Sequence, residues 1–104
     1  MSDAAPKAYL LVIARVTDRA KMGAYAKALA DSGLYAQHGG FYRFIGPATV
    51  PLEDWPDGQS VVLAEFPNRA AAEAFWFSAT YQNDVKPIRD GAGEFNVALF
   101  EGLA

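Results

Sequence analysis

Three residues of the sequence, His38, Arg43 and Glu65, have side chains that suit proton transfer and anion binding. His38 is the only histidine, and an imidazole can act as a general base near neutral pH. Glu65 is the only carboxylate inside the apolar run of a predicted central strand, where an unpaired charge is expensive to bury. If antiparallel neighbours carry Arg43 and Glu65, these side chains meet, and we interpret the three residues as a candidate catalytic group.

Each of the three residues also has a structural explanation. Arg43 is the available partner for Glu65 in a cross-strand ion pair. His38 precedes two glycines at a helix end, where a polar side chain favours the negative pole of the helix dipole. The alternative is that all three line one polar end of an apolar cavity, where they bind a carboxylate or enol oxygen and move a proton. Both interpretations stay open from the sequence.

The aromatic residues form a second group of candidates. Phe75 and Trp76 have the spacing of residues that pack a helix against a sheet, and Tyr81 offers a hydroxyl beyond Ser78. Trp55 lies in a loop bounded by prolines, where it could close over a ligand or pack across a dimer interface.

Composition excludes several classes of site. The net charge is -3 and the nine Lys and Arg residues are scattered singly, which disfavours nucleic acid as a partner. The chain has no cysteine and one histidine, so disulfides, thiolate sites and sites that need two imidazoles are excluded. The sequence has no phosphate-binding glycine loop, nucleophile elbow or metal-spaced acid cluster, and we expect neither a cofactor nor a metal. The apolar run at 8–16 is too short to span a bilayer, so we expect a cytoplasmic protein without a membrane partner.

The periodicity of the sequence predicts the order β-α-β-β-α-β within a single domain, 1–104, whose residues 1–6 form a loosely ordered tail. The predicted strands are 8–16, 41–46, 60–66 and 93–102. A helix is expected from 18 to about 37, a second helix after Asn68, and a short one opened by Ser78 and broken or restarted at Pro87. The segment between 46 and 60 is a loop or an irregular hairpin arm with three prolines. We predict an α+β, ferredoxin-like fold, a four-stranded antiparallel sheet of order 4-1-3-2 with both helices on one face.

Both faces of the predicted central strands are apolar. In 8–16 the residues alternate between Tyr9, Leu11 and Ile13 on one side and Leu10, Val12 and Ala14 on the other. An antiparallel sheet with one wet face normally alternates apolar with polar residues. Two helices cover only one face, so we expect a homodimer in which the sheets face each other about a twofold axis.

Several segments occur in a specific order along the chain: "AYLLVIARVTD", "HGGFYRFIG", "LEDWP", "VVLAEFPNRAAAEAFW", "SATYQ" with a downstream Arg89, and an apolar strand before Glu101. In this order they resemble the bacterial "domain of unknown function 1330" family, a branch of the dimeric α+β barrel superfamily. Ala79 and Thr80 stand where the family's box usually has a proline and an acid. The more distant resemblance to cofactor-free monooxygenases, lactone isomerases and haem-binding barrels is one of fold only.

We therefore predict a protein that binds a small apolar or aromatic acid-like molecule between the sheet and the helices. The candidate ligand contacts are Tyr9, Trp55, Trp76, Tyr81 and Arg89, and the candidate catalytic residues are His38, Arg43 and Glu65. Two alternatives stay open: a cofactor-independent monooxygenase, isomerase or lyase-type enzyme, and a non-catalytic dimeric interaction module.

Overall fold

Four antiparallel strands form the sheet, in the order β2-β3-β1-β4. The computed structural model describes residues 5–103, and its strands are β1 (Ala8–Val16), β2 (Phe41–Gly46), β3 (Ser60–Phe66) and β4 (Gly93–Glu101). This order is the predicted 4-1-3-2 read from the opposite edge, and the predicted strand bounds agree to within one residue. Most of the loose tail expected at 1–6 lies outside the described residues.

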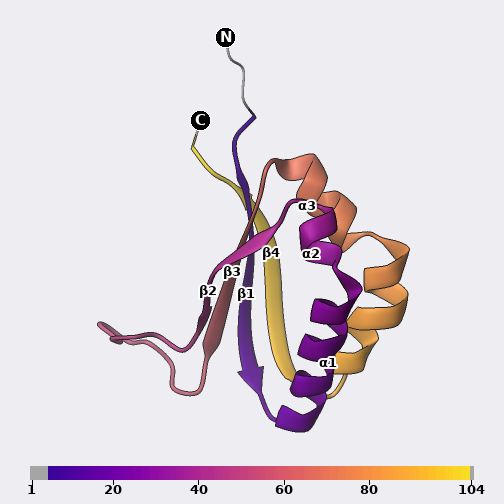
Figure 1. The fold of residues 1–104 in the computed structure, drawn as a ribbon. Coiled ribbons are helices and arrows are strands. Elements are labelled where there is room, and N and C mark those ends of the chain that lie inside the picture. The colour runs from indigo at the N-terminus through magenta and orange to yellow at the C-terminus, as the bar shows by residue number, and fades with distance from the viewer. Residues whose placement is uncertain (1–4, 104) are drawn as a thin grey trace.

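The helices cover one face of this sheet (Figure 1). They are α1 (Arg19–Ser32), α2 (Leu34–Gln37), α3 (Arg69–Trp76), the π-helical η1 (Thr80–Val85) and the 3-10 helix η2 (Lys86–Arg89). The Asp18 side chain accepts a hydrogen bond from the Lys21 amide at 3.1 Å, and that of Asn68 from the Ala71 amide at 2.8 Å. Asp18 and Asn68 are therefore the N-caps of α1 and α3.

The single helix expected from 18 to about 37 is wrong, because Gly33 divides it. Gly33 has φ +67°, and this left-handed conformation ends α1 and starts α2 in a new direction. The division matters for the site, since it turns Tyr35 of α2 toward the aromatic core, where its ring stacks on Phe75 with centroids 4.7 Å apart.

The segment after α3 follows the prediction more closely. The Ser78 hydroxyl accepts a hydrogen bond from the Tyr81 amide at 3.2 Å and opens η1. Pro87 lies in η2, which follows η1 directly. This path leaves Tyr81 only 2% exposed, in the layer between the sheet and the helices.

The core lies between the sheet and the helical layer. Its fully buried aromatic side chains are Phe66 of β3, Phe75 of α3 and Tyr81 of η1. Gly40 comes so close to Phe66 that a Cβ atom at this position would overlap the ring. Glycine is therefore required where the chain enters β2.

The other face of the sheet, which we call the open face, is covered by none of the helices within residues 5–103 and is also apolar. Strand register places Tyr9 opposite Glu65 and Phe100, and Phe44 opposite Leu63, so all five share this face. Phe41, Phe44 and Phe100 are 46%, 52% and 52% exposed. The predicted apolar character of both faces is confirmed.

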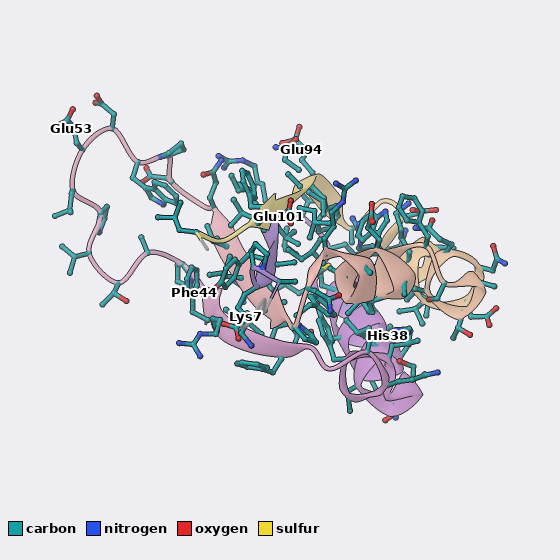
Figure 2. The ribbon with its side chains drawn as sticks, turned by 90° about the horizontal axis from the view of Figure 1, so that it is seen from above. Lys7, His38, Phe44, Glu53, Glu94 and Glu101 are labelled. Carbon is teal, nitrogen blue, oxygen red and sulfur yellow. The ribbon has the colours of Figure 1, made fainter. Side chains whose placement is uncertain are left out.

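Between β2 and β3 the chain leaves the body of the molecule as a long excursion over residues 47–59, which we call the arm. Figure 1 shows the arm projecting from the lower end of the sheet on the side opposite the helices, and Figure 2 shows Glu53 at its far end. Of the two interpretations of this segment, the irregular hairpin arm describes it better.

Candidate functional site

Four of the five tyrosines of the chain gather on the helical side of the sheet. Tyr25 comes from α1, Tyr35 from α2, Tyr42 from β2 and Tyr81 from η1. The Tyr25 and Tyr81 hydroxyls are 2.8 Å apart, and the ring centroids of Tyr35 and Tyr42 are 4.7 Å apart. Four separate elements thus bring phenol groups to one place.

These tyrosines line a partly enclosed space of about 70 Å³, which we call the inner cavity. Its floor is aliphatic, formed by the helix-facing residues of β1, and Trp76 and Phe95 complete its aromatic walls. A larger outer hollow of about 380 Å³ lies between α1 and β2 and shares Leu29, Tyr35 and Tyr42 with the inner cavity. Tyr35 and Tyr42 therefore form part of the wall between the inner cavity and the outer hollow.

Arg89 supplies the only charge in the lining of the inner cavity among the described residues. Its guanidinium carbon lies 4.3 Å from the ring centroid of Phe95 and 5.7 Å from that of Tyr25, within the range of cation–π attraction. No carboxylate within residues 5–103 lies at ion-pair distance from Arg89. The cavity thus holds a cation whose charge is not neutralised by an acid of the described chain.

Burial raises the pKa of three of the four phenol groups. It is the main cause that raises the pKa of Tyr25 and of Tyr35 well above the usual value near 10, and it raises the pKa of Tyr42 as well. At neutral pH these hydroxyls are hydrogen-bond donors. The described lining contains no carboxylate and no imidazole, so it can hold an anion but supplies no conventional base.

The structure brings Arg43 and Glu65 together, but on the open face. Arg43 Nε lies 3.9 Å from Glu65 Oε1, and the two side chains are 55% and 15% exposed. The register with β3 shifts between Tyr42 and Phe44, so Arg43 is the extra residue of a β-bulge in β2. The cross-strand ion pair expected from the sequence is present, and its nitrogen-to-oxygen distance is near the upper limit for an ion pair.

His38 lies on the other side of the sheet. It caps the C-terminus of α2, and its ring meets that of Phe75 edge-on at 6.3 Å. Figure 2 shows His38 beside the helices and Phe44 on the opposite side. The sheet therefore separates the imidazole from Arg43 and Glu65, and the three residues do not line one cavity in this chain.

Three of the five candidate ligand contacts, Trp76, Tyr81 and Arg89, line the inner cavity. Tyr9 lies on the open face and Trp55 in the arm. Four further lining residues, Tyr25, Tyr35, Tyr42 and Phe95, were not predicted as site residues from the sequence. Tyr25 could have been predicted, because it lies among the apolar positions of its helix and a buried tyrosine hydroxyl needs a hydrogen-bond partner.

Other classes of site find no support in the described part of the chain. No three metal-binding side chains come together within residues 5–103. None of the helices found there is long and apolar enough to cross a membrane.

The sheet order and the single helical layer define a ferredoxin-like α+β protein. The chain belongs to the family described as "Domain of unknown function (DUF1330)", whose model matches residues 7–103. The sequence has no significant match among functionally curated proteins.

Solved structures with the same fold include proteins with and without an assigned activity. A dimeric ferredoxin-like protein of unknown function from Jannaschia sp. CCS1 is 20% identical, with 92% of this chain and 99% of that chain covered and a TM-score of 0.68. A protein of unknown function from Rhodopseudomonas palustris is 20% identical, with 95% and 84% covered and a TM-score of 0.60. SnoaB, a cofactor-independent oxygenase from Streptomyces nogalater, is 14% identical, with 96% of each chain covered and a TM-score of 0.63. At these identities the similarity shows the fold, and it confirms the predicted fold class.

Proposed function

We propose that the inner cavity binds a small organic acid with an apolar or aromatic body. The observation that carries this proposal is Arg89, a guanidinium that lines a partly enclosed aromatic cavity without a carboxylate partner among the described residues. A carboxylate or enolate oxygen would supply the missing charge. Arginine suits this role because its planar group of N–H donors can bind both oxygens of a carboxylate.

The tyrosines give the ligand its second set of contacts. The hydroxyls of Tyr25 and Tyr81 already meet at 2.8 Å, and an anion beside them can accept a hydrogen bond from either. Tyrosine phenols are neutral at physiological pH and so do not repel the anion, and the raised pKa values of Tyr25 and Tyr35 extend this into the alkaline range. Trp76 and Phe95 offer flat apolar surfaces to a ring.

The size of the cavity limits what fits. A cavity needs roughly 10 to 15 Å³ to hold one water molecule. The inner cavity, at about 70 Å³, therefore has room for the acid group of a ligand and a few more heavy atoms. Most ligand sites enclose at least roughly 300 Å³. The body of a larger ligand would therefore extend past Tyr35 and Tyr42 into the outer hollow, which has that volume.

Thermal unfolding with a panel of ligands tests this proposal, because a ligand that binds only the folded state raises its stability. Aromatic carboxylates, with lactones alongside, would be compared with neutral amides of the same shape. We expect the acids to raise Tm more than the amides, and Arg89→Met to remove the difference. Arg69→Met is the matched control, because Arg69 is exposed and pairs with Glu73 at 3.4 Å. Equal shifts for acids and amides, or an acid response that survives in Arg89→Met, would contradict the proposal.

Catalysis in the same cavity is the second candidate, and the fold of SnoaB favours it. Because the described lining has no carboxylate or imidazole base, the substrate would have to ionise readily itself, with Arg89 stabilising the resulting oxyanion. Oxygen consumption with acidic phenols, in wild type and in Arg89→Met, tests it. Binding without turnover would instead favour a non-catalytic module.

We further infer that the chain forms a homodimer through the open face. The exposure of Phe41, Phe44 and Phe100 supports this, since the described chain offers no helix to cover them. Solved structures of the same fold from Jannaschia sp. CCS1 and Thermobifida fusca YX are described as dimeric. Light scattering at micromolar concentration should give about twice the chain mass of 11.2 kDa.

A further inference from the structure

The arm exposes apolar side chains that nothing in the described chain covers. Leu52 is 89% exposed, Val50 is 65% exposed and Trp55 is 41% exposed. Isolated exposed apolar residues are ordinary, but three within six positions of a projecting segment are not. Such a cluster indicates that another surface packs against the arm.

The direction of the arm limits what that surface can be. In Figures 1 and 2 the helices lie on one side of the sheet and the arm extends on the other. A body packed on the open face would therefore lie beside the arm. A body packed on the helices would lie away from it.

The base of the arm is continuous with the open face. A hollow of about 340 Å³ is bounded by Phe44 and Val61 of the sheet and by Trp55 of the arm. Phe44 and Val61 both belong to the open face, as their register shows. One partner can thus contact the sheet, fill this hollow and touch the arm at the same time.

The open face alone is smaller than one side of a stable protein–protein interface. Four strands about 4.8 Å apart and about seven residues long give a flat area on the order of 450 Å², before side-chain relief is added. A stable interface commonly buries about 800 Å² on each partner. The arm is the adjacent apolar surface that brings the total toward this value.

We propose that the arm clasps a second copy of this chain, with Leu52 and Trp55 packed against the partner subunit. This inference rests on the proposed open-face homodimer and extends it. Under a twofold axis each protomer both gives and receives an arm, so the contact occurs twice and closes the assembly.

The fluorescence of Trp55 tests burial of the arm directly. The chain has two tryptophans, and Trp76→Phe leaves Trp55 as the only one. In the dimer we expect blue-shifted emission and weak quenching by acrylamide. Both should revert as dilution separates the protomers. Emission that does not change while light scattering shows the dimer dissociating would overturn the proposal.

Substitutions in the arm test its contribution to association. Leu52→Asp and Trp55→Ala should each raise the dimer dissociation constant at least about tenfold, while circular dichroism stays that of the folded chain. Phe77→Ser is the control, because Phe77 is 70% exposed at the end of α3, in the helical layer away from the open face. Unchanged dissociation constants for both arm variants in a dimeric wild type would overturn the arm contact alone. A wild type that is monomeric at micromolar concentration would overturn the open-face dimer and the arm contact together.

Discussion

The Tyr25 and Tyr81 hydroxyls lie 2.8 Å apart and join α1 to η1 across 56 residues of sequence. Their rings meet edge-on, with centroids 6.5 Å apart. This pair links the two parts of the helical layer at the wall of the inner cavity. It is therefore both a packing contact and a part of the proposed binding site.

Tyr25→Phe should lower the free energy of unfolding by about 1 to 3 kcal/mol, because it leaves the Tyr81 hydroxyl buried without its partner. Tyr81→Phe should have a similar effect, and the double variant should lose less than the sum. Urea unfolding measures all three. Tyr9→Phe is the control, since no side-chain hydrogen bond involves this open-face residue among the described contacts. Additive losses would show that the two hydroxyls do not depend on each other.

Stability should fall as pH rises above about 10, the ordinary tyrosine pKa. The folded chain raises the pKa of Tyr25 and of Tyr35 through burial, so above this pH the unfolded chain loses phenol protons that the folded chain keeps. Fewer protons on the unfolded state mean that the free energy of unfolding decreases, by up to about 1.4 kcal/mol per pH unit for each such tyrosine. Urea unfolding between about pH 8 and about pH 11 measures this slope.

Tyrosinate absorbance checks the same prediction independently. Below the unfolding transition, fewer than the five tyrosines of the chain should ionise at alkaline pH, and all should ionise once the chain unfolds. Tyr25→Phe should reduce the slope of stability against pH. If all five ionised together near pH 10 in the folded chain, burial would not protect these phenols.

Arg43 and Glu65 should show weak coupling in the monomer and stronger coupling in the dimer. At 3.9 Å, and with Arg43 largely exposed, the pair should contribute about 0.2 to 1 kcal/mol. A partner on the open face would remove water from both side chains, and losing one of them would then leave a buried charge. A double-mutant cycle with Glu65→Gln and Arg43→Met, measured above and below the dimer dissociation constant, compares the two states. Equal coupling at both concentrations would place the pair outside the interface.

Two glycine substitutions should have opposite effects. Gly40→Ala should destabilise the chain by about 1 to 3 kcal/mol, because its Cβ would overlap the buried Phe66 ring. Gly23→Ala should stabilise it by about 0.5 to 1 kcal/mol, since Gly23 lies within α1 and a Cβ there meets nothing within 4 Å. Thermal unfolding of the two variants measures both changes in stability: Tm should fall for Gly40→Ala and rise for Gly23→Ala. A stable Gly40→Ala would mean that the entrance to β2 is less tightly packed than the structure shows.

Local chemistry made much of the fold predictable. Strand bounds follow from alternation and turn residues, which act over a few positions. Strand order follows from the usual topology of a β-α-β-β-α-β chain. The break at Gly33 was not predicted, because a glycine within an apolar helical pattern is compatible with both a continuous helix and a left-handed end.

The same alternation predicted that Arg43 and Glu65 share one face, and their side chains lie 3.9 Å apart there. It could not place His38, which follows a helix and has no strand register. The His38 side chain lies on the helix-covered side of the sheet, where its ring contacts that of Phe75 edge-on. A candidate group drawn from three segments therefore divided between two faces of one sheet.

The amino-acid sequence by itself determined where the strands lie and the apolar character of both sheet faces, because these depend on short-range patterns. Only the tertiary structure decided that Tyr25, Tyr35, Tyr42 and Tyr81 meet around one cavity with Arg89. The four tyrosines come from four elements, and their meeting depends on how helices pack over the sheet, which no local spacing encodes. The same packing buries these phenols among aromatic side chains and places Arg89 beside Tyr25 and Phe95, and this juxtaposition defines the proposed site.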